Sequence, residues 1–132
     1  MRVRDGMSEL VLTVGPEHTL REAASQMAAR NVGAAVVLDP ELPGPGIITE
    51  RDILLSIARG EDPDQERVCD HKTDDLVFAA PDWSLEQAAA EMVRGRFRHL
   101  VVIDAGDIAG ILSVRDIVRC WTTAGATSEV GS

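Results

Sequence analysis

Hydrophobic positions follow two spacings along this chain, and the same succession of spacings occurs twice. Apolar residues three and four positions apart predict an amphipathic helix over 20–30 and a second over 85–94. Each helix is followed by a continuous apolar run, 34–38 and 100–103, which is typical of a strand buried on both faces. The pattern therefore predicts an α+β fold in which each half has the order strand, helix, strand, strand, helix.

Short local signals set the expected ends of these elements. In each half a hydroxyl residue precedes a Glu or Gln by three positions, which matches the capping box that begins a helix. These pairs are Thr19 with Glu22 and Ser84 with Gln87, and the expected helix stops are Asn31 and Gly95. The other expected elements are strands at 10–14, 46–48, 76–79 and 108–112 and helices at 49–58 and 113–121.

The second half of the chain repeats the first in sequence as well as in pattern. Val3-Arg4-Asp5 recurs as Val68-Cys69-Asp70, and Gly46-Ile47-Ile48 recurs as Gly110-Ile111-Leu112. The single change in offset between the copies falls in the proline-rich loop 40–45, so a duplication is expected. We expect repeat 1 over 3–60, a linker over 61–67, repeat 2 over 68–122 and a disordered tail over 123–132. Halves of about 60 residues are marginal alone, so the repeats are expected to pack into one compact pair.

Composition and charge narrow the function classes. The chain has 132 residues, 45% of them hydrophobic and 27% charged, with a formal net charge of −9 at pH 7. Such an acidic chain is not expected to bind nucleic acid or an anionic membrane surface. Its apolar runs are shorter than the roughly 18 residues of a membrane span, and its start lacks the pattern of a signal peptide. With only two cysteines, reduced thiols and a cytoplasmic location are expected.

One four-residue motif recurs where a strand meets the last helix of each half. It is Thr49-Glu50-Arg51-Asp52 in the first half and Ser113-Val114-Arg115-Asp116 in the second. A hydroxyl there caps the free N–H groups of a helix, and the same helix start favours a phosphate. The acidic residue can accept hydrogen bonds from both hydroxyls of a ribose, and the arginine can bind phosphate. An ordinary cap and a nucleotide site are both compatible with the motif, and a cap can give way to a ligand.

These repeated motifs make the chain resemble a tandem pair of CBS domains, the cystathionine-β-synthase-type module. The resemblance rests on the Val-Arg-Asp-Gly-Met-Ser opening, on Arg98-His99-Leu100-Val101-Val102, and on the two Gly-Ile-(Ile/Leu)-(Thr/Ser) segments with their Arg-Asp. It covers about 3–121, and the chain looks like the small stand-alone bacterial members. The resemblance implies two pseudo-symmetric repeats with two clefts between them, which bind adenine nucleotides or adenosyl ligands and signal occupancy to an effector protein.

The resemblance also implies which residues form each cleft. In cleft A they are Thr49, Asp52, Ala79, Phe97, Arg98, His99, Val101 and Arg115. In cleft B they are Ser113, Asp116, Val14, Val32, Gly33, Ala34, Val36 and Arg51. Cleft A has Arg98 and His99 where cleft B has Gly33 and Ala34, so cleft A is expected to be the better phosphate site.

Other candidate chemistry is weaker. Cys69, His71, Asp74 and Asp75 lie close together in sequence, but a Cys-x-His pair is a weak metal signal, and no metal site is expected. The chain lacks the sequence patterns of a serine hydrolase, a zinc protease or a Walker A loop, so no catalytic residue and no required cofactor are expected.

Three hypotheses stay open from the sequence. The chain is a regulatory sensor of AMP, ADP, ATP or a related ligand, a structural or adaptor homodimer with empty clefts, or, least favoured, a small enzyme. Apolar residues on the last helices, Ile53, Leu54, Ile57, Ile117, Val118 and Trp121, can belong to the core or to an interface. More apolar helix surface than one core can use favours a homodimer.

Overall fold

The chain forms two compact units, described here from a computed structural model that covers residues 1–131 and the side chains of residues 1–123. One unit is continuous, Val11–Leu76. The other combines the N-terminal segment Met1–Leu10 with the chain from Val77 onward. The units of packing therefore differ from the linear repeats, because the first ten residues belong to the unit that contains the second repeat.

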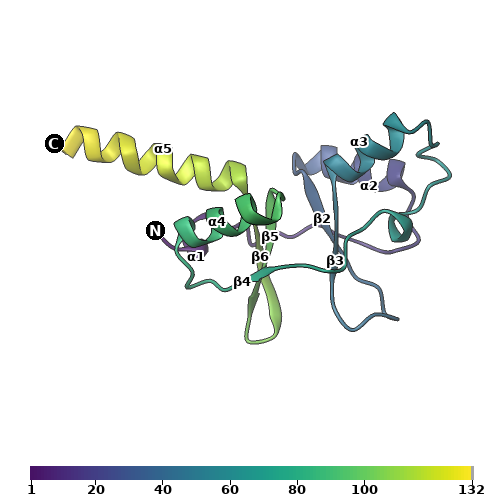
Figure 1. Cartoon of the computed structure of the whole chain (residues 1–132), viewed down its shortest axis with the longest axis horizontal. Helices are drawn as coiled ribbons and strands as arrows, with labels where there is room; N and C mark the ends of the chain where they lie inside the picture. Colours follow the sequence, from purple (N-terminus) through teal and green to yellow (C-terminus); the bar gives the residue numbers. More distant parts are fainter. Residues whose placement is uncertain (132) are drawn as a thin grey trace. The chain divides into compact units, whose positions relative to one another are not determined.

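The continuous unit is a three-stranded sheet with two helices and a short 3-10 helix (Figure 1). Its elements are β1 (Thr13–Val14), α2 (Leu20–Arg30), β2 (Ala34–Val37), β3 (Gly46–Thr49), α3 (Glu50–Ala58) and η1 (Val68–Asp70). The strand order is β1-β2-β3, with β2 parallel to β1 and antiparallel to β3. All four residues of β2 are buried, which confirms the expectation for its apolar run.

The discontinuous unit has the same plan. Its elements are α1 (Val3–Gly6), β4 (Phe78–Ala79), α4 (Leu85–Gly95), β5 (His99–Asp104), β6 (Asp107–Ser113) and α5 (Val114–Gly131). The strand order is β4-β5-β6, with β5 parallel to β4 and antiparallel to β6. The predicted order of strand, helix, strand, strand, helix is thus present in both units, and the α+β class is confirmed.

Each unit has its own hydrophobic core between its sheet and its helices. In the continuous unit the core includes Leu20, Ala23 and Met27, the face predicted for the first helix. In the discontinuous unit it includes Leu85, Ala88 and Met92, the matching face of the second helix. The helical spacing of apolar residues in the sequence thus correctly predicts which face of each helix is buried.

The helix starts agree with the sequence more closely than the helix stops. Thr19 and Ser84 are the N-caps, and Asn31 ends α2 in the left-handed conformation with φ 54°. The stop expected at Gly95 comes one residue later, because Gly95 is the last residue of α4 and the C-cap is Arg96, with φ 58°. Gly95 has a different use: a Cβ there would lie 1.9 Å from the Phe97 ring. The lack of a side chain lets the Phe97 ring pack against the backbone.

Two further differences concern element length. The outer strands β1 and β4 have two residues each, shorter than the runs 10–14 and 76–79 predicted for them. The last helix is longer than 113–121, since α5 has the bounds Val114–Gly131. The disordered tail was predicted over 123–132, and most of this segment lies outside the residues whose side chains the structure describes.

Two short helices that the sequence pattern did not predict complete the cores. Val3 of α1 and Val68 of η1 are both fully buried, each in the core of its own unit. Val3 donates its N–H to the Trp83 carbonyl at 2.8 Å, and Val68 donates its N–H to the His18 carbonyl at 2.8 Å. The valine of the Val-x-Asp motif that begins each repeat is therefore bound, through a backbone hydrogen bond, to the residue just before the N-cap of a helix.

Candidate functional site

The start of α3 is the centre of the predicted site in the continuous unit. Thr49 ends β3 and is the N-cap of α3. Its Oγ1 accepts the Asp52 N–H at 3.2 Å, and the Asp52 Oδ2 accepts from the Thr49 N–H and hydroxyl, each at 2.9 Å. The capping interpretation of this motif is therefore confirmed.

The start of α5 has the same arrangement in the other unit. The Ser113 Oγ accepts the Asp116 N–H at 3.0 Å, and the Asp116 Oδ2 accepts the Ser113 N–H at 2.8 Å. Asp116 also lies 3.4 Å from the Arg119 guanidinium. Both Asp carboxylates are half-buried, so each is fixed in position by its own helix and still reaches the surface.

The first residues of the central strands lie beside these helix starts. In the register of β2 and β3, Ala34 is opposite Thr49, and the Gly33 carbonyl accepts the Glu50 N–H at 2.9 Å. In the register of β5 and β6, His99 is opposite Ser113, and the Arg98 carbonyl accepts the Val114 N–H at 2.9 Å. Each unit therefore gathers a hydroxyl, a carboxylate and a strand start at one edge of its sheet.

The predicted site residues differ in exposure. Five small or aliphatic ones are buried, two of them, Val14 and Ala79, in the cores described above: Val14, Ala34, Val36, Ala79 and Val101. The three arginines Arg51, Arg98 and Arg115 are exposed. The remaining residues are half-buried: Val32, Gly33, Thr49, Asp52, Phe97, His99, Ser113 and Asp116. Buried residues shape the sheet edge, and the other two groups are those whose side chains are accessible to a ligand.

Each predicted cleft draws on residues of both units. Within one unit, the structure brings Thr49 and Asp52 together with Gly33 and Ala34, and within the other it brings Ser113 and Asp116 together with Arg98 and His99. Cleft A requires the first helix start with Arg98 and His99, and cleft B requires the second with Gly33 and Ala34. The assembly of the two clefts stays a prediction.

The residues weighed as metal ligands in the sequence separate in the structure. Cys69 is exposed, and the pKa of its thiol is raised by desolvation and by the nearby Asp70 and Glu17 carboxylates. Asp74 pairs with the Lys72 ammonium, and His71 is hydrogen-bonded to Glu66. Among the described residues, the possible metal-ligand group that includes His71 is completed by Glu61 and Glu66 rather than by Cys69. Cys120 is buried in a core, as expected for a small apolar side chain.

None of the described helices combines the length and the apolar character needed to cross a membrane.

The family model of the CBS domain matches the chain twice, over residues 3–59 and 68–122. The chain belongs to the CBS domain family. Among curated proteins, the CBS domain-containing protein YhcV of Bacillus subtilis is 37% identical over 116 residues, which cover 87% of this chain and 81% of YhcV. Other relatives are longer: the chain spans 41% of the uncharacterized protein MJ1225 of Methanocaldococcus jannaschii and 19% of the Arabidopsis thaliana protein CBSCBSPB3.

Solved structures of CBS proteins share the fold. The CBS domain protein PAE2072 from Pyrobaculum aerophilum, in complex with AMP, is 28% identical with a TM-score of 0.77, and the match covers 88% of this chain and 89% of that one. The hexameric CBS-CP12 protein from bloom-forming cyanobacteria is 28% identical with a TM-score of 0.84, over 89% of this chain and 69% of that one. The resemblance drawn from the repeated motifs is thereby confirmed.

Proposed function

We propose that this CBS pair is a regulatory module that binds an adenine nucleotide, or a related adenosyl ligand, in clefts between its repeats and has no chemistry of its own. The observation that carries the proposal is the same hydroxyl–carboxylate helix start in both units, at Thr49–Asp52 and Ser113–Asp116. The AMP complex of the Pyrobaculum aerophilum relative supports the ligand class.

The chemistry of each helix start suits a nucleotide. The first N–H groups of a helix and its dipole attract phosphate. The Asp52 carboxylate accepts hydrogen bonds from Thr49, and the two hydroxyls of a ribose offer donors of the same kind. The ribose hydroxyls of a ligand can therefore replace the Thr49 donors at this carboxylate. The carboxylate then keeps its hydrogen bonds both with and without the ligand.

The two clefts are expected to differ in affinity. Cleft A combines Thr49 and Asp52 with Arg98, His99 and Arg115, whereas cleft B has Gly33 and Ala34 at the matching positions and only Arg51 as a cation. Charge-assisted hydrogen bonds to phosphate are the stronger class. Cleft A is therefore the proposed phosphate site, and cleft B, with its small residues, suits an adenosine-like ligand with weaker phosphate contacts.

A structural adaptor with empty clefts is the second candidate. One observation favours it: the Asp52 and Asp116 carboxylates accept the backbone N–H of Thr49 and of Ser113, as the acidic residue of an ordinary capping box does. In that case the carboxylates serve stability alone.

Calorimetry with AMP, ADP, ATP and S-adenosylmethionine on the wild type and on Asp52→Ala separates the two candidates. We expect at least one ligand to bind the wild type, and Asp52→Ala to weaken binding about tenfold to a hundredfold, because a hydrogen bond to a charged acceptor contributes about 1.5–3 kcal/mol. Glu22→Ala is the matched control, since Glu22 makes the same capping contact to Thr19 and is not among the predicted cleft residues. It should leave the affinity unchanged.

Arg98→Ala tests the ranking of the clefts. It should weaken AMP binding and leave adenosine binding nearly unchanged, because only AMP carries the phosphate. An absence of binding by every ligand at millimolar concentration favours the adaptor. If Asp52→Ala is destabilised but binds ligand like the wild type, the carboxylate is only a cap.

A further inference from the structure

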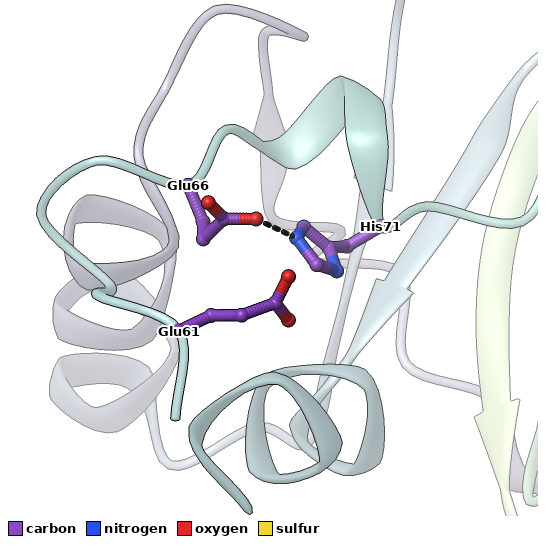
Figure 2. Close-up of side chains that lie close together, drawn as sticks. All are labelled: Glu61, Glu66 and His71. Atoms are coloured by element: carbon purple, nitrogen blue, oxygen red, sulfur yellow. Dashed lines mark hydrogen bonds and ion pairs between the residues drawn. The ribbon is translucent and has the colours of Figure 1, made fainter. Parts of the chain in front are cut away.

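Three ligand-type side chains converge in the continuous unit, away from the helix starts described above. Glu61 follows α3, Glu66 precedes η1, and His71 directly follows η1. One donor atom from each lies within 4.8 Å of the other two. Figure 2 shows the two carboxylates and the imidazole pointing toward a common point, with the Glu66 Oε1 2.8 Å from the His71 Nε2.

The fold holds these side chains from both ends of the linker. The Glu61 Oε1 accepts the hydroxyl of Ser56 at 2.9 Å, and Ser56 is only 1% exposed. The Glu66 carbonyl accepts the Leu20 N–H at 2.9 Å, at the first residue of α2. His71 donates its N–H to the carbonyl of the fully buried Val68 at 3.0 Å. The cluster is therefore fixed to α2, α3 and η1 through hydrogen bonds on all three residues.

The described ion pair within the cluster joins the Glu66 carboxylate to the His71 imidazole, which is charged only when protonated. Among the ion pairs that the structure describes, none joins a lysine or an arginine to Glu61 or Glu66, and the adjacent Lys72 pairs with Asp74. Two carboxylates a few ångströms apart repel each other, more strongly where the side chains are partly buried. His71 has a side chain only 10% exposed, and Glu66 one that is 29% exposed. A divalent cation bound between Glu61 and Glu66 would offset the negative charges of both carboxylates.

The geometry points to a binding site for one divalent transition-metal ion, Zn²⁺ in the first place, with Glu61, Glu66 and His71 as ligands. Zn²⁺ binds imidazole nitrogen and carboxylate oxygen at about 2.0–2.2 Å, which sets neighbouring donor atoms of a tetrahedral site about 3.3 Å apart. The ion can therefore take the place of the proton between His71 and Glu66 with a small widening of that contact. Glu61 closes by side-chain rotation, and water supplies the fourth ligand.

The donor set discriminates among ions. One imidazole among the ligands favours Zn²⁺ and its transition-metal neighbours over Mg²⁺ and Ca²⁺, which prefer oxygen throughout. The other unit lacks these ligands. At the equivalent positions of the repeat it has Gly6 in place of His71 and Met1 in place of Glu66. The proposal is thus one ion per chain, bound by the continuous unit. It is independent of nucleotide binding at the helix starts.

The test uses tag-free full-length protein, stripped with EDTA and titrated with ZnCl₂ by calorimetry, with metal content measured after gel filtration. We expect one Zn²⁺ per chain, a raised melting temperature because the ion binds the native state, and no comparable response to MgCl₂. His71→Ala and Glu66→Gln should each lower the Zn²⁺ affinity at least tenfold. Circular dichroism checks that each variant is folded, and Glu61→Gln provides a third ligand variant if His71→Ala is not.

Two controls separate this site from its surroundings. Asp70→Asn removes an exposed carboxylate next to His71, and Cys69→Ser removes the exposed thiol two residues before it. Both should bind Zn²⁺ like the wild type. The proposal is overturned if Zn²⁺ is lost on gel filtration of the wild type, if Cys69→Ser abolishes binding, or if Asp70→Asn weakens it as much as Glu66→Gln does.

Discussion

At the scale of single residues, Glu22 and Gln87 show how one position in a repeated motif sets a charge-dependent contact. In α2 the Glu22 carboxylate accepts from both the backbone and the hydroxyl of Thr19, at 3.3 Å and 3.1 Å. In α4 the Ser84 hydroxyl accepts the Gln87 N–H at 3.0 Å, but the return contact that completes the expected capping box is not among the described hydrogen bonds. We therefore expect the two helix starts to differ in their response to pH.

Acidification should loosen the start of α2 and spare that of α4. The backbone N–H and the hydroxyl of Thr19 lower the pKa of Glu22 below its ordinary value of 4.5. A lowered pKa means that the stabilisation is complete above the ordinary value and is lost as pH falls through the lower, folded value. Hydrogen exchange between about pH 6 and about pH 3, corrected for intrinsic rates, should show protection lost in the first turn of α2 but kept in that of α4.

Glu22→Gln is the control for this prediction. It removes the titrating carboxylate, so α2 should then respond to pH as α4 does. Equal loss of protection at both helix starts in the wild type would assign the effect to general acid destabilisation instead.

Residue types with a strong local preference were predictable from the sequence, and contacts set by the fold were not. Thr19, Ser84 and Thr49 have capping side chains, and each is an N-cap. Arg96 takes the left-handed position expected for Gly95, while Gly95 itself lies against the Phe97 ring, where a Cβ would come within 1.9 Å of a ring atom. The convergence of Glu61, Glu66 and His71 carries no sequence pattern, since it arises from the path of the linker around α3 and η1.

At the scale of elements, α1 and η1 have equivalent roles in different units. Arg4 donates its N–H to the Pro81 carbonyl at 3.0 Å, as Cys69 does to the Pro16 carbonyl at 3.0 Å. Ser8 pairs with Ile111, and Thr73 pairs with Ile47. The N-terminal segment thus completes the unit that contains β4, β5 and β6, while the segment after the linker completes the other unit.

Because each segment completes the unit of the other repeat, we can predict which unit a core substitution destabilises. Val3→Ala should destabilise the unit of α4, β5 and β6, by about 2 kcal/mol, because a fully buried valine loses two methyl groups and leaves a cavity. Val68→Ala should have a similar effect on the unit of α2, β2 and β3. Hydrogen exchange resolved by peptide should show the loss of protection in 77–123 for Val3→Ala and in 11–76 for Val68→Ala.

The two valines serve as controls for each other, since they are the same residue at equivalent positions. The prediction fails if Val3→Ala loosens chiefly the peptides of 11–76, which is where a strictly linear repeat would place the effect.

The order of helices and strands was predictable because burial of one face of an element requires apolar residues at a regular spacing, and this spacing can be read from a short stretch of sequence. Residues Ala34–Val37 form a strand as their apolar run indicates, and the helix of Leu20 buries the face that its spacing indicates. The membership of Met1–Leu10 in the other unit was not predictable in this way, because it depends on pairing between residues far apart in the chain, such as Ser8 with Ile111.

At the scale of the whole molecule, the balance of charge and exposed apolar surface bears on assembly. The net charge of −9 opposes non-specific association. Even so, several large apolar side chains on the last helix of each unit are exposed. They are Leu54, Leu55 and Ile57 on α3 and Val114, Val118 and Trp121 on α5. Of the residues weighed as core or interface, Ile53 and Ile117 are core. The exposed side chains are the candidates for an interface between copies of the chain.

We expect the chain to form a homodimer in solution through these exposed helix faces. Sedimentation at micromolar concentration should give the mass of a dimer for the wild type. Leu54→Glu combined with Ile57→Glu should shift the mass toward the monomer, because two carboxylates would be desolvated in the interface at a cost of several kcal/mol. Both side chains are more than half exposed in the single chain, at 64% and 51%, so the fold of the variant should be retained.

Leu10→Glu and Leu42→Glu provide the matched control, since both are exposed leucines outside the helices, at 84% and 40%. These substitutions add the same charge and should leave the dimer intact. The relative from bloom-forming cyanobacteria is hexameric, so the assay must resolve larger species as well. A wild type that sediments as a monomer, or a larger assembly that the α3 double variant leaves unchanged, would show that these helix faces do not hold the copies together.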